Sequence, residues 1–196
     1  MRGLEVNVEY PDWSCVEGLA LRRAYLQVDD AAAREYLKDF VVARQIKRGK
    51  ITSAAAAAES QIANGEGPAS YVSLKTALLL RDSGDRPGIG RAKDPYFYNF
   101  SYVNGYIDNI MSKGMDFAFS MPKDDRRKYY LYGAYQCFLL DRFSPGWKRG
   151  FLEKGKDLDV MMADLLRLTP AEKEEIAQRL PTRYSDVEPP PLRKNP

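Results

Sequence analysis

The fold of the middle of this chain depends on one stretch, Asn64-Gly65-Glu66-Gly67-Pro68-Ala69-Ser70-Tyr71. It follows the alanine run 54–58, which has a high intrinsic helix propensity. Asn64-Gly65 predicts a break in the helix that contains this run, with Asn64 as the N-cap of a second helix. Glu66 and Pro68 would then lie in the first turn of the second helix, where an acidic side chain is favourable and proline costs least.

Two further helices are predicted before the one that contains the alanine run. Ser14 and Glu17 form a capping box that opens the first of them. Asp29-Asp30 caps the second, which runs over 31–48. Apolar residues recur on one face of the second helix at helical spacing, and they predict its buried side: Ala33, Tyr36, Leu37, Phe40, Val41 and Ala43.

Further helices are predicted after the stretch. The longest clear amphipathic pattern covers 125–142, and its buried side is expected to carry Leu131, Tyr135, Phe138 and Leu139. Shorter helices are expected at about 102–111, after the turn at 144–146, and after Asp157. The last predicted helix begins with a capping box formed by Thr169 and Glu172.

These patterns together predict a mostly α fold. We expect a compact bundle of about seven or eight helices, with at most a small N-terminal strand or hairpin around Val6 and Val8. A chain of 196 residues is long enough to bury a real core. We expect a single helical domain over 1–180, followed by a proline-rich disordered tail over 181–196.

Charge and hydropathy limit the classes of partner. The net charge is +3, from 30 basic and 27 acidic residues that are interspersed, so we expect no nucleic-acid partner. No apolar run approaches the ~20 residues of a membrane span, and no signal peptide is visible, so we expect a cytoplasmic protein without a membrane partner. Cys15 and Cys137 are predicted to be buried free thiols rather than a disulfide.

Two further segments invite a functional interpretation. Glycines in 82–95 suggest a phosphate cradle, but the Walker spacing and a preceding strand are missing, so a surface loop is favoured. The aromatic stretch 96–102 could stack bases or sugars. Because no basic patch surrounds it, we favour a role in the core or in lining a pocket.

The stretch 64–71 resembles the N-E-G-F-A-S-Y segment of the gluzincin zinc metallopeptidases, the class that includes alanyl aminopeptidase-like enzymes. Glu66 matches their third zinc ligand. Later in the chain, Tyr129-Tyr130-Leu131-Tyr132-Gly133-Ala134 is similar to their helix with the pattern Y-x-K-G-A. Tyr130 matches the catalytic tyrosine, which donates a hydrogen bond to the oxyanion, and Tyr132 stands where that family has lysine. The resemblance implies hydrolysis of a peptide bond by metal-activated water.

The chain departs from this family in one decisive respect, since it contains no histidine. The family takes two zinc ligands from an H-E-x-x-H segment, and Glu66 alone cannot hold zinc. We therefore expect a helical part of such an enzyme that binds no cofactor and is inactive as a lone chain. Zinc would be bound only if an upstream or separate segment carrying H-E-x-x-H were supplied.

Two explanations fit this departure: the chain is the C-terminal part of a longer or split enzyme, or it is a degenerate pseudoenzyme. Both predict that Glu66 and Tyr130 point into one groove. The alternative is a non-catalytic helical interaction or small-ligand-binding protein. In that case Glu66 is an acid at a helix start and Tyr130 is a packing residue.

Overall fold

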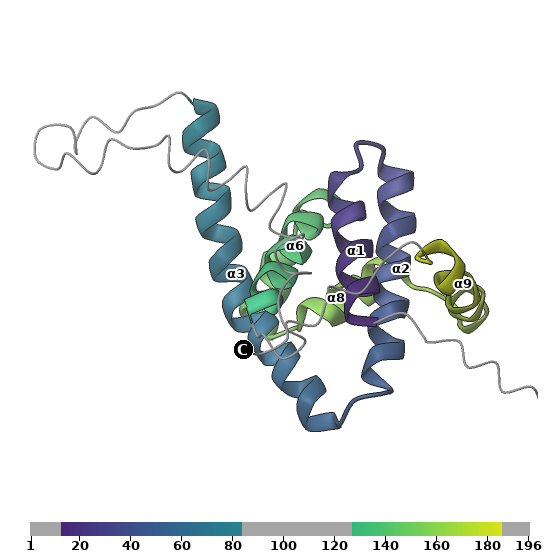
Figure 1. Ribbon diagram of the computed structural model, residues 1–196. Coiled ribbons are helices and arrows are strands. Elements are labelled where there is room, and N and C mark those ends of the chain that lie inside the picture. Colours follow the sequence, from purple (N-terminus) through teal and green to yellow (C-terminus); the bar gives the residue numbers. More distant parts are fainter. Residues whose placement is uncertain (1–12, 84–126, 186–196) are drawn as a thin grey trace, which may run out of the picture.

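The computed structural model describes residues 13–83 and 127–185, and these residues form helices without any strand. The predicted mostly α fold is therefore confirmed. The expected N-terminal strand, the helix at 102–111 and the aromatic stretch 96–102 lie outside the described residues. The helices, labelled as in Figure 1, are α1 Trp13–Leu26, α2 Asp30–Arg48, α3 Ser53–Ser83, α6 Arg127–Phe143, α7 Trp147–Lys154, α8 Leu158–Leu166 and α9 Pro170–Arg183.

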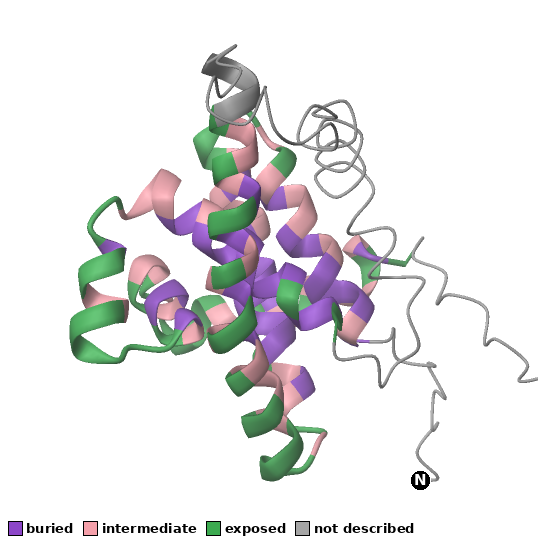
Figure 2. Ribbon diagram, turned by 90° about the vertical axis from the view of Figure 1, so that its left-hand side faces the viewer, coloured by how far each residue is buried: buried purple, intermediate pink, exposed green. Residues whose placement is uncertain are grey.

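The helices pack around α6. The hairpin of α1 and α2 lies on one side of α6, and the long helix α3 crosses it on the other side (Figure 1). Helix α8 packs against α2, α3 and α6, and α9 packs against α2. Buried residues gather where these helices meet, as the purple segments of Figure 2 show. None of the described helices combines the length and apolarity needed to cross a membrane.

Several predicted helix ends are confirmed. An Asp29 carboxylate oxygen accepts a hydrogen bond of 2.8 Å from the backbone N–H of Ala32. Thr169 and Glu172 form the reciprocal capping box at the start of α9. Of the predicted buried side of α6, Leu131, Tyr135 and Leu139 are buried, and Phe138 is partly buried against the core. Local sequence therefore determines these ends well.

The predicted capping box at Ser14 and Glu17 is wrong. Helix α1 already includes Ser14, and Glu17 is fully buried. The Glu17 carboxylate instead lies 2.7 Å from the ammonium of Lys47 on α2. The Glu17 carboxylate therefore pairs with Lys47 in the core of the bundle and does not cap the start of α1.

The predicted break at Asn64-Gly65 is also wrong, because α3 continues through it and through Pro68. The Asn64 side chain does cap a helix, but a different one: its oxygen accepts a hydrogen bond of 2.8 Å from Leu158 N–H at the start of α8. Asp157, at the N-cap position of α8, makes no side-chain capping bond. Asn64 thus satisfies a helix end that the sequence assigned to Asp157.

The reason for the unbroken helix is its contact with α6. A Cβ atom placed on Gly67 would lie 2.5 Å from the Cα of Gly133. A Cβ atom placed on Gly133 would lie 2.7 Å from the Cα of Gly67, and closer still to the carbonyl oxygen of Ala63. The two helices therefore touch backbone to backbone, which only glycine permits at both positions. This contact accounts for the continuity of α3 across a segment of weak intrinsic helix propensity.

The C-terminal boundary extends past residue 180. Helix α9 includes Pro181, and Tyr184 is fully buried. The Tyr184 hydroxyl donates a hydrogen bond of 3.0 Å to Asp39 on α2, and Arg179 donates one of 2.9 Å to the same carboxylate. Burial raises the pKa of the Tyr184 phenol, so the hydroxyl remains a donor. The remainder of the predicted tail, 186–196, lies outside the described residues.

The glycine contact predicts opposite effects of alanine at neighbouring positions of α3. Gly67→Ala or Gly133→Ala should lower the free energy of unfolding by about 1–3 kcal/mol or more, because the methyl group has no room. Gly65→Ala is the matched control, because a Cβ there meets nothing within 4 Å. It should stabilise the helix by roughly 0.5–1 kcal/mol. Urea denaturation compares the three, and equal effects at Gly65 and Gly67 would contradict the crossing.

Candidate functional site

The two residues that match the metallopeptidase pattern flank the helix crossing. Glu66 directly precedes Gly67 on α3 and is exposed. Tyr130 lies about one turn before Gly133 on α6 and is 36% exposed. Neither side chain makes a hydrogen bond or ion pair with another described residue. Both groups are therefore open to a partner or ligand from outside. That they enter a single groove stays a prediction.

Tyr130 differs from the tyrosines beside it. Tyr129 and Tyr132 are buried, and burial raises the pKa of both phenols. The Tyr129 hydroxyl donates to Glu59, and the Tyr132 hydroxyl donates to the backbone oxygen of Ser14 at 3.0 Å. These two tyrosines hold α6 against α3 and α1. Of the three, Tyr130 is the one whose hydroxyl is left for another role.

The described residues do not fit a zinc ion. Among them, no three histidine, cysteine, aspartate or glutamate side chains lie close enough together to hold a metal. Cys15 and Cys137 are buried free thiols, as predicted. Burial raises the pKa of Cys137 to about 12, so it is a neutral thiol at physiological pH. No metal-dependent step can be derived from these residues alone.

A groove of about 660 Å³ runs along α3 just before Glu66. Its wall includes Asn64 and Gly65, together with Ser60 and with Arg48 at the end of α2. Neither Glu66 nor Tyr130 lines it. The groove therefore does not supply the shared cleft that the metallopeptidase resemblance predicts.

Tyr71, the last residue of the 64–71 stretch, anchors α3 to α6. Its hydroxyl donates to Asp141, which also accepts hydrogen bonds from Lys75, from Trp147 at 2.9 Å and from Lys148 at 2.7 Å. Burial opposes the charge, but these four donors hold the pKa of Asp141 well below its usual value. One carboxylate thus ties α3, α6 and α7 together, and Tyr71 is a structural residue.

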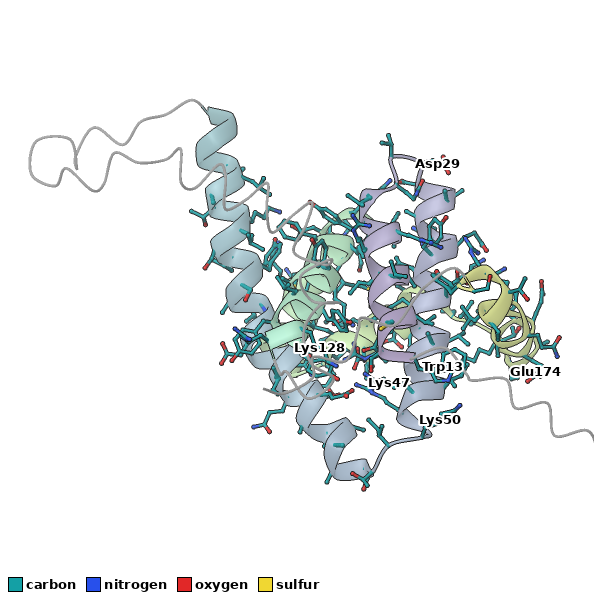
Figure 3. All side chains as sticks on the ribbon, viewed as in Figure 1. Trp13, Asp29, Lys47, Lys50, Lys128 and Glu174 are labelled. Atoms are coloured by element: carbon teal, nitrogen blue, oxygen red, sulfur yellow. The ribbon has the colours of Figure 1, made fainter. Side chains whose placement is uncertain are left out.

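The structure also brings together a set of charges that the sequence patterns do not predict, of which Glu17, Arg44 and Lys47 are buried and the other three are partly buried. We call Glu17, Arg44, Lys47, Arg48, Glu59 and Asp159 the buried charge cluster. Its centre is Lys47, which points from α2 toward α3 in Figure 3. The Lys47 ammonium lies 2.7 Å from Glu17 on α1 and 2.7 Å from Glu59 on α3. The cluster therefore joins three helices through one cation.

The other half of the cluster surrounds Asp159 on α8. Arg44 and Arg48 both pair with its carboxylate, and Gln136 on α6 donates a hydrogen bond of 2.7 Å to it. Although burial favours the protonated acid, Arg44 and Arg48 hold the pKa of Asp159 below its usual value. Asp159 is therefore a carboxylate that binds α8 to α2 and α6.

A sequence signal for this cluster existed. The apolar face of α2 passes through Leu37, Phe40 and Val41, and the same helical spacing continues to Arg44 and Lys47. Both side chains are buried. Cations that follow directly on an apolar face indicate buried ionic partners, because an unpaired buried charge costs several kcal/mol.

Comparison of the chain with family models, with curated proteins and with solved structures gave no match. The interpretation of the site therefore depends on the residues and contacts described above.

The buried charge cluster predicts that Lys47 stabilises the fold far more than Lys38, a partly exposed lysine of the same helix. Lys47→Met leaves Glu17 and Glu59 without their cation and should cost about 3–5 kcal/mol of unfolding free energy. Lys38→Met, which removes a partly exposed pair with Glu35, should cost less than about 1 kcal/mol. Urea denaturation of both variants measures the difference. If the two variants have equal stability, Lys47 is not the centre of the cluster.

Proposed function

We propose that this chain is a metallopeptidase-like helical scaffold, which presents Glu66 and Tyr130 beside one helix crossing and is inactive as a lone chain. The observation that carries the proposal is the contact between Gly67 and Gly133. It makes neighbours of two motifs that lie more than sixty residues apart in the sequence, and each carries one of the two matched side chains. Their exposure and lack of described partners support a role in an assembled site.

In this proposal the chain contributes two groups to the zinc site, the carboxylate of Glu66 and the phenol of Tyr130. A catalytic zinc site takes three protein ligands, so the two histidines would come from a segment carrying H-E-x-x-H. This chain would hold the Glu66 carboxylate in place and present the Tyr130 hydroxyl as a hydrogen-bond donor. The rigidity of the crossing supports such a role, because helices position functional groups better than loops do.

A non-catalytic helical interaction or small-ligand-binding protein is the second candidate. It is favoured by the same contact, because backbone packing alone requires glycine at 67 and 133. In this case the two motifs serve the fold, and Glu66 and Tyr130 are ordinary exposed residues. The two candidates therefore predict different effects of substituting Glu66 and Tyr130 on zinc binding and turnover.

Zinc titration tests the proposal. The purified chain alone should show no tight zinc site and should not cleave an aminoacyl reporter, because it supplies one ligand. Together with a segment that carries H-E-x-x-H, it should bind one zinc ion. Glu66→Gln should abolish that binding, whereas Tyr130→Phe should keep the zinc and lower kcat more than it changes KM.

Glu153→Gln, at an exposed position on α7, is the matched control and should change neither zinc binding nor turnover. All three substituted positions are exposed, so thermal stability should be unaffected. A tight stoichiometric zinc site in the chain alone would contradict the proposal, since other residues would then hold the metal. If the assembled pair binds zinc equally well with Glu66→Gln, the first candidate is wrong and the non-catalytic candidate is favoured.

A further inference from the structure

A second pocket lies between α2 and α8. It is a pocket of about 200 Å³ whose wall is partly apolar, with Phe40, Val160 and Met162, and partly charged, with Arg44, Arg48 and Asp159. Val160 is 48% exposed, whereas Arg44 is only 3% exposed. The pocket therefore connects the surface to the buried charge cluster. A mostly apolar wall with a few polar groups is typical of small-molecule sites.

Arg44 is the unusual residue in this wall. Its Nε lies 3.1 Å from an Asp159 oxygen, yet none of its three guanidinium nitrogens makes a hydrogen bond in the described structure. Buried polar groups nearly always have hydrogen-bond partners, so three unsatisfied nitrogens in one residue require an explanation. The acids Asp159, Glu17 and Glu59 raise the pKa of Arg44 against the cost of burial, so it remains charged.

The neighbouring cations already have their partners. Lys47 pairs with two carboxylates, and Arg48 pairs with Asp159 and donates to Ser60. The pocket wall thus holds two guanidinium groups and one carboxylate. All three guanidinium nitrogens of Arg44 lack a hydrogen-bond acceptor, whereas in Arg48 only Nε does. A ligand that completes the wall would bring hydrogen-bond acceptors to the guanidinium nitrogens of Arg44.

We propose that this pocket binds a small monocarboxylate with a short apolar chain. The guanidinium fork of Arg44 matches the two oxygens of a carboxylate, and the apolar chain would pack against Phe40 and Met162. The pocket volume of about 200 Å³ is many times the ~10–15 Å³ that one water molecule needs, so a ligand of a few non-hydrogen atoms has room. A phosphate group fits less well, since its second charge would face Asp159. The proposal does not depend on Glu66 or Tyr130.

Titration of the chain with butyrate, followed by NMR and by calorimetry, tests the inference. Butyrate should bind saturably with one site per chain. Butyramide, which has the same shape without the charge, and inorganic phosphate should each bind at least about tenfold more weakly. Arg44→Lys keeps the charge but loses the fork, and it should weaken butyrate binding by a similar factor.

Because Arg44 is buried, its substitution could lower butyrate binding by disturbing the fold. A second variant at an exposed position separates the two effects. Val160→Phe fills the mouth of the pocket from an exposed position and should abolish butyrate binding while the circular dichroism spectrum stays unchanged. Val72→Phe, at a 57% exposed position outside the pocket wall, is the matched control and should bind butyrate normally. Absence of saturable butyrate binding, equal binding of butyramide, tighter binding of phosphate, or equal loss in both phenylalanine variants would each overturn the proposal.

Discussion

The backbone contact between Gly67 and Gly133 is the constraint on which the rest of the bundle depends. It sets how closely α3 approaches α6, and the long-range contacts of α3 follow from that approach. On one side of the crossing Tyr71 reaches Asp141, and on the other Asn64 caps α8. A larger residue at either glycine would separate the two helices and strain both contacts.

The fold class could be predicted from the sequence, because helix periodicity and capping are local properties. The course of α3 could not. Gly65 and Gly67 look equivalent in sequence, but a side chain at Gly65 would meet open space and one at Gly67 would meet another helix. The pattern around Asn64 favours a break when only local propensity is considered. Tertiary packing outweighs that preference, which amounts to about 1 kcal/mol per glycine and about 3 kcal/mol for Pro68.

The two candidate sites show a different limit of the sequence. Glu66 and Tyr130 were singled out by pattern, and the structure places both beside the crossing and exposed. The buried charge cluster was missed, although Arg44 and Lys47 continue the apolar face of α2. Spacing shows that a charged residue falls on a buried face. It does not show which acids pair with that residue, because the partners are distant in sequence. Glu17 lies 30 residues from Lys47, and Asp159 lies much farther from Arg44.

Helix α3 runs unbroken across the stretch 64–71 because Gly67 rests directly on Gly133. NMR spectroscopy tests it without any substitution. The backbone contact predicts a nuclear Overhauser effect between the Hα protons of Gly67 and Gly133, together with helical Cα chemical shifts throughout 62–72. Absence of that cross-peak, with non-helical shifts at Asn64 and Gly65, would show that the helix breaks there and that the crossing does not hold the bundle together.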